Sequence, residues 1–270
     1  MKYQMIITDY DGTLTESGKN YIDEETLSAI KSFKDRGGKF IICSGRPISS
    51  ISKIMEKYGL SGVTVGLQGA VISDTTTGEE IYAKGHSPSF AVEIIKKLKA
   101  EGGEFVVYIG DDMYLEHDCD STRIYQEMLN DKGFFVEDLE SYIIKTNKPV
   151  SKVGFLTSAE RVNELVKKYN EIYGGKGAIF NSGYKYMVEV ISPDYAKGEA
   201  VRFLSKYYDI SLDKIITVGD STNDIPLLNG PWHGVCVGDG HEKLKEIAKE
   251  ITVPLKDKPI KTLIEKYTKD

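Results

Sequence analysis

Both ends of the chain alternate short apolar segments with longer charged ones, and this alternation constrains the fold more than any other feature of the sequence. Near the N-terminus three apolar segments are predicted to be buried strands: "MIIT", "KFIICSGR" and "VTVGLQGA" at 5–8, 39–46 and 63–70. Between them, Asp23 is placed to cap a helix that ends at Gly37-Gly38, and another helix is expected over 48–58. This order predicts a doubly wound α/β fold with a parallel sheet and right-handed crossovers.

The same alternation returns near the C-terminus. From Lys197 a helix is expected to Tyr208, followed by the strands "KIITVG", "HGVCVG" and "ITVPL" at 214–219, 233–238 and 251–255. A short helix after Asp224, another after the second of these strands and a terminal helix complete the pattern. The two ends of the chain are therefore expected to build one core domain.

The middle of the chain follows another pattern. "AVISD" and "EEIYA" flank residues 75–78 as a hairpin, not as a crossover unit. Helices are then expected over 90–100, 122–130 and 160–173, and strands over 104–110, 113–117, 152–157, 178–182 and 185–192. We expect residues 84–188 to form an α+β domain inserted into a core of residues 1–83 and 189–270.

Charge and cysteine content exclude several classes of protein. The 270 residues carry a formal net charge of -6, whereas a nucleic-acid binder normally carries a basic stripe. Cys43, Cys119 and Cys236 are widely spaced, which suggests neither a disulfide framework nor a zinc site. The chain enters a strand without a leader pattern and has no apolar run of about eighteen residues, so we expect a cytoplasmic protein without membrane attachment. The sequence leaves the oligomeric state open.

Polar side chains follow three of the predicted core strands. Asp9 and Asp11 come after the first strand, Ser44 lies at the end of the second, and Asp220 follows "ITVG". Parallel strands bring their carboxyl ends to one edge of the sheet, where ligands bind. Asp9, Asp11, Asp220 and Asp224 cannot all stay ionised at close range without a cation. All-oxygen ligands favour Mg²⁺ over zinc.

A metal next to a carboxylate suggests covalent phosphoryl transfer. An aspartate would attack phosphorus to form an acyl phosphate that water later cleaves, and Asp11 would protonate the leaving oxygen and then activate water. Ser44, Lys197 and loop N–H groups are suited to hold the transferring phosphoryl group.

Four motifs resemble those of the haloacid dehalogenase superfamily and occur in its order: "DYDGTLT" at 9–15, "SGR" at 44–46, Lys197-Gly198 and "GDSTND" at 219–224. The inserted segment is similar in size and position to the α/β cap of the Cof-like branch. The resemblance covers essentially the whole chain. It implies a Rossmann-like phosphatase core, a mobile cap and Mg²⁺ as cofactor.

The resemblance also implies roles for individual residues. It makes Asp9 the nucleophile and Asp11 the acid/base, and it assigns phosphate binding to Ser44, Gly45, Lys197 and Asn223. Metal ligation falls to Asp9, the main-chain carbonyl of Asp11, Asp220 and Asp224. "LQGA" departs from the branch because Gln68 stands where the branch usually has Asn.

The function favoured by these patterns is Mg²⁺-dependent hydrolysis of a small phosphorylated metabolite, such as a sugar phosphate. A phosphomutase and a catalytically silent phospho-ligand binding protein are the alternatives. A glycosyltransferase could also use a D-x-D pair, but no second feature supports it. Arg46 is interpreted as a structural partner of a core carboxylate, outside the site, and a second metal site at His117 is disfavoured because its spacing matches no metal loop. Asn181, Tyr184 and Lys185 are candidate substrate contacts for which packing or surface display is the simpler interpretation.

Overall fold

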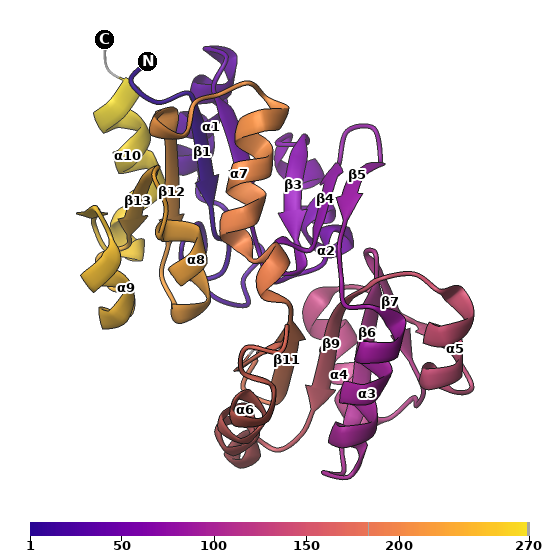
Figure 1. Cartoon of the computed structure of the whole chain (residues 1–270). Helices are drawn as coiled ribbons and strands as arrows, with labels where there is room; N and C mark the ends of the chain where they lie inside the picture. The colour runs from indigo at the N-terminus through magenta and orange to yellow at the C-terminus, as the bar shows by residue number, and fades with distance from the viewer. Residues whose placement is uncertain (183, 269–270) are drawn as a thin grey trace.

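A computed structural model describes residues 1–182 and 184–268 and contains a five-stranded parallel sheet (Figure 1). The strand order is β14-β13-β12-β1-β2, and the neighbours pair in parallel. The strands are β1 (Met5–Thr8), β2 (Lys39–Ile42), β12 (Ile215–Gly219), β13 (His233–Cys236) and β14 (Glu250–Ile251). Strands from the two ends of the chain thus lie side by side, which confirms the predicted α/β fold. "ITVPL" as a full strand is wrong, because β14 ends at Ile251.

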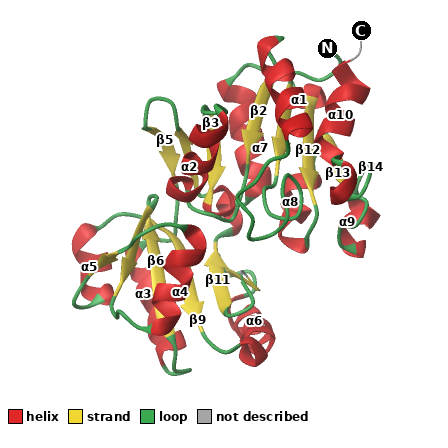
Figure 2. Cartoon of the chain, turned by 180° about the vertical axis from the view of Figure 1, so that it is seen from behind, coloured by secondary structure: helices red, strands yellow, loops and turns green. Residues whose placement is uncertain are grey.

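Helices cover both faces of this sheet (Figures 1 and 2). One group packs with Ile6, and the other packs with Met5 and Ile7, because successive side chains of a strand point to opposite faces. The first group is α1 (Glu24–Asp35), α2 (Ile48–Tyr58) and α10 (Pro259–Thr268), and the second is α7 (Lys197–Tyr207), α8 (Ile225–Leu228) and α9 (Glu242–Ile247). Asp23 caps α1 as predicted, accepting a hydrogen bond from the Thr26 N–H at 3.0 Å.

A small antiparallel sheet lies next to β2. It consists of β3 (Val63–Gly66), β4 (Val71–Asp74) and β5 (Glu79–Ala83), and a parallel bridge between Cys43 and Val65 joins it to the chain after β2. The predicted hairpin around residues 75–78 is confirmed. The prediction of one strand over 63–70 is wrong beyond Gly66, because residues 67–69 form a 3₁₀ turn with positive φ at Leu67 (50°) and Gln68 (62°).

A six-stranded sheet holds the middle of the chain, in the order β10-β11-β9-β6-β7-β8. The strands are β6 (Glu104–Ile109), β7 (Asp112–Leu115), β8 (Phe134–Phe135), β9 (Val150–Leu156), β10 (Ile179–Ser182) and β11 (Met187–Ile191). One face packs against α3 (Pro88–Lys99), α5 (Leu139–Thr146) and α6 (Ala159–Tyr173), and the other against α4 (Asp120–Leu129). The sequence analysis missed β8 and α5, because two residues and eight residues are too short to show a clear period.

The face of the six-stranded sheet that carries α4 also meets the first part of the chain. Tyr108 of β6 belongs to one buried cluster with Ile48 of α2 and Tyr195. Asp111, in the β6–β7 turn, accepts hydrogen bonds from the N–H groups of Ile48 (2.6 Å) and Ser49 (2.7 Å) and so caps α2 from the other sheet. Across residues 1–182 and 184–268, every helix is too short or too polar to cross a bilayer.

Candidate active site

The carboxyl ends of β1, β2 and β12 meet at one pocket of about 400 Å³. Asp9 follows β1 directly, and its N–H donates to the carbonyl oxygen of Val218 in β12 at 2.9 Å, which places Asp9 beside Asp220. The pocket is lined by six of the predicted site residues: Asp9, Asp11, Ser44, Gly45, Asp220 and Asn223. Parallel register is what brings these distant segments together.

Lys197 and Asp224, the other two predicted site residues, are buried next to Asp9. The Lys197 Nζ donates to Asp9 Oδ1 at 2.5 Å and to Asp224 Oδ1 at 2.6 Å. The second oxygen of Asp224 accepts from the N–H groups of Asp220 (3.1 Å) and Ser221 (3.2 Å). Both oxygens of Asp224 are therefore engaged, and this carboxylate fixes Lys197 and the turn after β12.

The carboxylates of Asp9, Asp220 and Asp224 have oxygens within 4.8 Å of one another, and this is the one cluster in the described part of the chain that could hold a metal ion. Burial, and then Asp224, raise the pKa of Asp9 well above its ordinary range and that of Asp220 to about 6. Burial alone would lower the pKa of Lys197, but Asp224 and Asp9 raise it. One lysine cation against three carboxylates leaves an excess of negative charge. An all-oxygen donor set with this charge fits a hard divalent cation.

Gly12 allows Asp220 to approach the first loop. Its φ is 87°, and a Cβ at this position would lie 2.5 Å from Oδ2 of Asp220. Thr13 then donates its hydroxyl proton to Asp220 Oδ1 at 2.8 Å. The turn after Asp9 and Asp11 therefore both bends the chain and seats the carboxylate from β12.

Arg46 is a site residue that the sequence analysis placed outside the site. Its guanidinium donates to both oxygens of Asp11, at 2.7 and 2.6 Å, and to Asn20 Oδ1 at 2.9 Å. The Asp11 carboxylate also accepts the Gly18 N–H at 3.0 Å. Arg46 is 2 % exposed and lies 5.0 Å from the ring centre of Tyr10. The expected core carboxylate partner is thus Asp11 itself. The signal was the place of Arg46 two residues after Ser44, at the same sheet edge.

The sequence analysis also missed Glu189 of β11, which lines the pocket from the six-stranded sheet, and its partner Lys152 of β9. The Lys152 Nζ donates to Glu189 Oε1 at 2.9 Å and to the carbonyl oxygen of Gly45 at 3.2 Å. Glu189 Oε2 accepts from the Gln68 amide at 3.2 Å, and the Asn223 amide lies 3.5 Å from Gln68 Oε1. Gln68 therefore links the two sheets beside the pocket. In the sequence Lys152 and Glu189 look like ordinary strand residues. Only the pairing of their strands shows that the two side chains meet.

The remaining candidates fall outside the pocket, with one exception. Tyr184 lines it, whereas Asn181 and Lys185 are not among the described residues that do. His117 is exposed and lies 2.7 Å from Glu104 Oε2. Among the described residues it belongs to no cluster of three metal-ligating groups.

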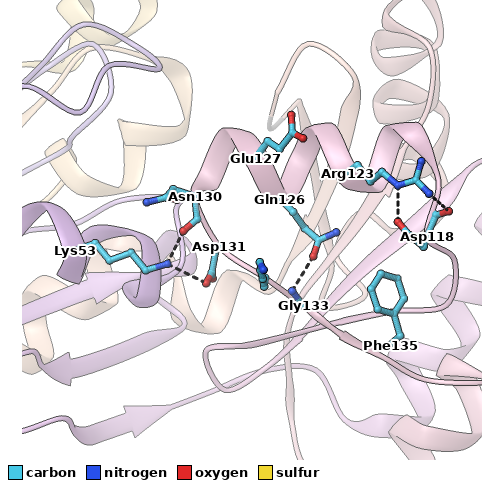
Figure 3. A pocket seen from close by; sticks show the side chains of 10 residues that line it. Lys53, Asp118, Arg123, Gln126, Glu127, Asn130, Asp131, Gly133 and Phe135 are labelled. Atoms are coloured by element: carbon cyan, nitrogen blue, oxygen red, sulfur yellow. Dashed lines mark hydrogen bonds and ion pairs between the residues drawn. The ribbon is translucent and has the colours of Figure 1, made fainter.

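A larger hollow of about 650 Å³ lies between α2 and α4 and contains none of the predicted site residues (Figure 3). Several of its charged groups bond to neighbouring residues. Lys53 donates to the carbonyl oxygen of Asn130 and lies 3.5 Å from Asp131, and Arg123 donates to Asp118 at 2.7 Å. The contacts of Lys53 at this hollow connect α2 with the end of α4.

A parallel sheet with carboxylates and a buried lysine at its carboxyl edge, and a second sheet contributing to the same pocket, defines a class of α/β enzymes whose chemistry lies at the strand ends. A family model for haloacid dehalogenase-like hydrolases matches residues 6–264, and the chain belongs to this family. It is therefore an enzyme of a hydrolase family.

Individual relatives agree with this assignment. The 5-amino-6-(5-phospho-D-ribitylamino)uracil phosphatase YitU of Bacillus subtilis is 25% identical, with 98% of each chain covered. Phosphatase YwpJ of the same organism is 24% identical over 93% of this chain and 94% of its own. Among solved structures, TM0651 of Thermotoga maritima superposes with a TM-score of 0.84 at 23% identity, covering 99% of this chain and 98% of its own. The sugar phosphatase BT4131 reaches 0.81 at 18% identity, covering 98% and 99%.

Proposed function

We propose that the protein is a Mg²⁺-dependent phosphatase that hydrolyses a small phosphorylated metabolite, a sugar phosphate or a similar compound, through an aspartyl-phosphate. The observation that carries this proposal is the buried Asp9 carboxylate, held on one oxygen by Lys197 and placed in a pocket with Ser44 and Asn223. The names of two relatives, a ribitylaminouracil phosphate phosphatase and a sugar phosphatase, support this class of substrate.

The proposed mechanism has two steps. An oxygen of Asp9 attacks phosphorus, and the bond between phosphorus and the leaving oxygen breaks. Asp11 donates a proton to that leaving oxygen. Asp11 then takes a proton from water, which attacks the phosphorus of the aspartyl-phosphate and releases inorganic phosphate and free Asp9. Ser44, the Gly45 loop, Lys197 and Asn223 bind the phosphoryl oxygens. Arg46 is a positioning residue that holds Asp11.

The proposed metal ligands are Asp9, the main-chain carbonyl of Asp11, and Asp220. Asp224 belongs to the same acidic cluster and supports the site by fixing Lys197, since both its oxygens are engaged. When bound, Mg²⁺ neutralises charge on the transferring phosphoryl group.

Residues 84–188 are proposed to act as the cap over a core of residues 1–83 and 189–270. Met128 and Tyr184 of this segment line the pocket together with the strand-end residues, which supports a role of the segment in choosing the substrate. A cytoplasmic location is part of the proposal. The free thiols of Cys43 and Cys236, both buried, fit a reducing compartment.

The test is release of inorganic phosphate by the purified protein from ethyl phosphate, p-nitrophenyl phosphate and a panel of phosphorylated metabolites. Excess chelator should abolish release and added Mg²⁺ should restore it. Full activity in excess chelator contradicts the metal-dependent mechanism. Isomerisation of a metabolite phosphate without release would indicate a phosphomutase, and tight binding without turnover would indicate a silent binding protein.

A further inference from the structure

One stripe of α4 lines a second, apolar hollow of about 350 Å³. Ile124, Tyr125 and Met128 follow at spacings of one, three and four residues and lie on the same side of the helix. Tyr184, Tyr186 and Met187 complete these walls from the chain before and within β11. We call these six residues the apolar pocket. No charged side chain is among the described residues that line it.

The apolar pocket adjoins the catalytic pocket. Met128 and Tyr184 line both hollows, so these two side chains form the boundary between them. A substrate whose phosphoryl group lies at Asp9 and whose remainder passes Met128 and Tyr184 would reach the apolar pocket. The volume of about 350 Å³ lies at the small end of the range for ligand sites.

The apolar pocket is unfilled by the protein's own side chains. Ile124 is 61% exposed and Tyr186 is 51% exposed, although both line a hollow next to the catalytic centre. Arg123 of the same helix instead lines the hollow of Figure 3, where it donates to Asp118, which lies just before the helix. Large apolar surface in a concave site beside a reaction centre is typical of ligand binding.

From these contacts we infer that the apolar pocket receives an aromatic ring carried by the leaving group of the substrate. Three tyrosine rings offer stacking and edge contacts to a flat ring, and two methionine sulfurs adapt to its edge. A sugar ring would need a hydrogen-bond partner for each hydroxyl group. Ser121 and Thr157 offer aliphatic hydroxyl groups here, but the other described residues that line this hollow are apolar or aromatic. The inference rests on the proposed phosphatase function and narrows its substrate class to phosphomonoesters with an aromatic ring beyond the phosphate-bearing carbon.

The experiment compares kcat/KM, measured by phosphate release in Mg²⁺, for ethyl, 2-cyclohexylethyl, 2-phenylethyl and 2-(2-naphthyl)ethyl phosphate. All four leaving groups are primary alcohols, so differences report contacts and not leaving-group acidity. We expect kcat/KM to be about tenfold or more higher for the aromatic esters than for the ethyl ester, as burial of one ring predicts. The cyclohexyl ester should fall between them.

Matched variants locate the effect. Ile124→Ser should lower the ratio of naphthylethyl to ethyl kcat/KM about threefold or more, mainly by raising KM for the aromatic ester. Ile144→Ser changes the same residue type on another helix of the same half of the structure, where Ile144 is 52% exposed, and should leave the ratio unchanged. Tyr186→Ser repeats the test from the β11 side.

The outcomes separate the two proposals. Phosphate release from all four esters at similar kcat/KM would leave the phosphatase function in place and overturn the inference. Equal preference for cyclohexyl and phenyl rings, or equal effects of Ile124→Ser and Ile144→Ser, would also overturn it. Release from none of the four esters, nor from the metabolite panel, would overturn the proposed function and the inference with it.

Discussion

The two walls of the catalytic pocket differ in the kind of side chain that they present. The core wall, formed by Asp9, Asp11, Ser44, Arg46 and Asp220, is charged or polar, and it comes from chain that follows parallel strands. The wall on the side of the six-stranded sheet, which we call the cap wall, is formed by Met128, Tyr184 and Glu189 and is mostly apolar. Its one carboxylate, Glu189, is already paired with Lys152.

This difference indicates that the two walls have different functions. The charged groups of the core wall lie at the sheet edge, where the strand register determines the distances between them. The cap wall offers mainly apolar contacts and contributes few reactive groups. Changes on the core wall should therefore abolish or slow reaction, and changes on the cap wall should alter stability and substrate choice. The predictions below test this difference in function, beginning with the largest effect.

Asp9→Asn should reduce turnover to the background rate. The amide keeps the shape of the side chain but is not an anionic nucleophile, so no aspartyl-phosphate can form. Phosphate release and mass analysis of the protein after brief exposure to an activated phosphate donor measure both effects. Asp213→Asn, an exposed carboxylate in the turn before β12, serves as the control and should keep wild-type activity. Phosphorylation of Asp9→Asn at wild-type levels would show that another residue is the nucleophile.

Asp11→Asn should slow hydrolysis of alkyl phosphates by about 10²–10⁴-fold, the usual contribution of general acid–base catalysis. The loss in the first step should be smaller for p-nitrophenyl phosphate, whose leaving group needs no proton. Since Asp11 is also proposed to activate water, the phosphorylated protein should then accumulate, and rapid-quench analysis can detect it. Equal losses for alkyl and aryl esters at every step would argue against the acid/base role.

Lys152→Met tests the buried ion pair between Lys152 and Glu189. Lys152 and Glu189 are fully or almost fully buried, so removal of the lysine leaves a buried carboxylate without its cation. The expected loss is about 3–5 kcal/mol in the free energy of unfolding, measured by denaturant titration. Lys152→Met combined with Glu189→Gln should recover most of it, because no unpaired charge remains.

The control for this prediction is Lys99→Met. Lys99 pairs with Glu140 at 3.0 Å but is 42% exposed, and such pairs contribute about 0–1 kcal/mol. Similar losses for Lys99→Met and Lys152→Met would mean that burial of the Lys152–Glu189 pair does not increase the effect of removing its lysine on the free energy of unfolding.

The sequence placed Asp9, Asp11, Ser44 and Asp220 at one edge of the sheet, because each of these residues lies at or just after the end of a predicted strand. A buried strand followed at once by Asp9 or Asp220 fixes where each carboxylate lies, once the sheet is parallel. The cap side could not be predicted in this way. Lys152 and Glu189 are 37 residues apart in the chain, and they meet only because β9 and β11 are neighbours in the sheet.

Arg46 shows the same limit on the core wall. The sequence shows that Arg46 follows Ser44 and Gly45. Its pairing with Asp11, however, depends on the conformation of the loop after β1. The turn at Leu67 and Gln68 was missed for a related reason. Two non-glycine residues with positive φ are unusual, and nothing in "VTVGLQGA" predicts that the strand stops at Gly66.

Arg46→Lys should lower kcat by about tenfold or more while keeping the positive charge. Lysine cannot reproduce the two parallel hydrogen bonds to Asp11, and a small misplacement of a catalytic group can cost up to about 10²-fold. The loss should be larger for ethyl phosphate than for p-nitrophenyl phosphate, which separates a role through Asp11 from a general loss of structure. Arg202→Lys, on the exposed side of α7, is the control. A loss that does not depend on the leaving group would contradict the positioning role.

The smallest effect concerns His86, which lies in the connection between β5 and α3. It is 4% exposed, exchanges two backbone hydrogen bonds of 2.9 Å with Val150, and packs against Phe90 and Tyr195. Its Nε2 has no hydrogen-bond partner in the described part of the chain. Burial lowers the pKa of His86 from 6.5 to about 4. The folded state therefore favours the neutral ring.

The sign of the pH effect follows from this shift. Between pH 6.5 and 4 the unfolded chain binds a proton at His86 that the folded chain does not, so the free energy of unfolding falls as pH falls. The loss from this residue should be about 1 kcal/mol at pH 5.5. His86→Phe keeps an aromatic ring and should remove this part of the pH dependence, as measured by denaturant titration at pH 7.5 and 5.5. His117→Gln, at an exposed histidine paired with Glu104, should leave the His86 part in place. Identical pH dependence of the free energy of unfolding in wild type and His86→Phe would show that protonation of His86 does not contribute to it.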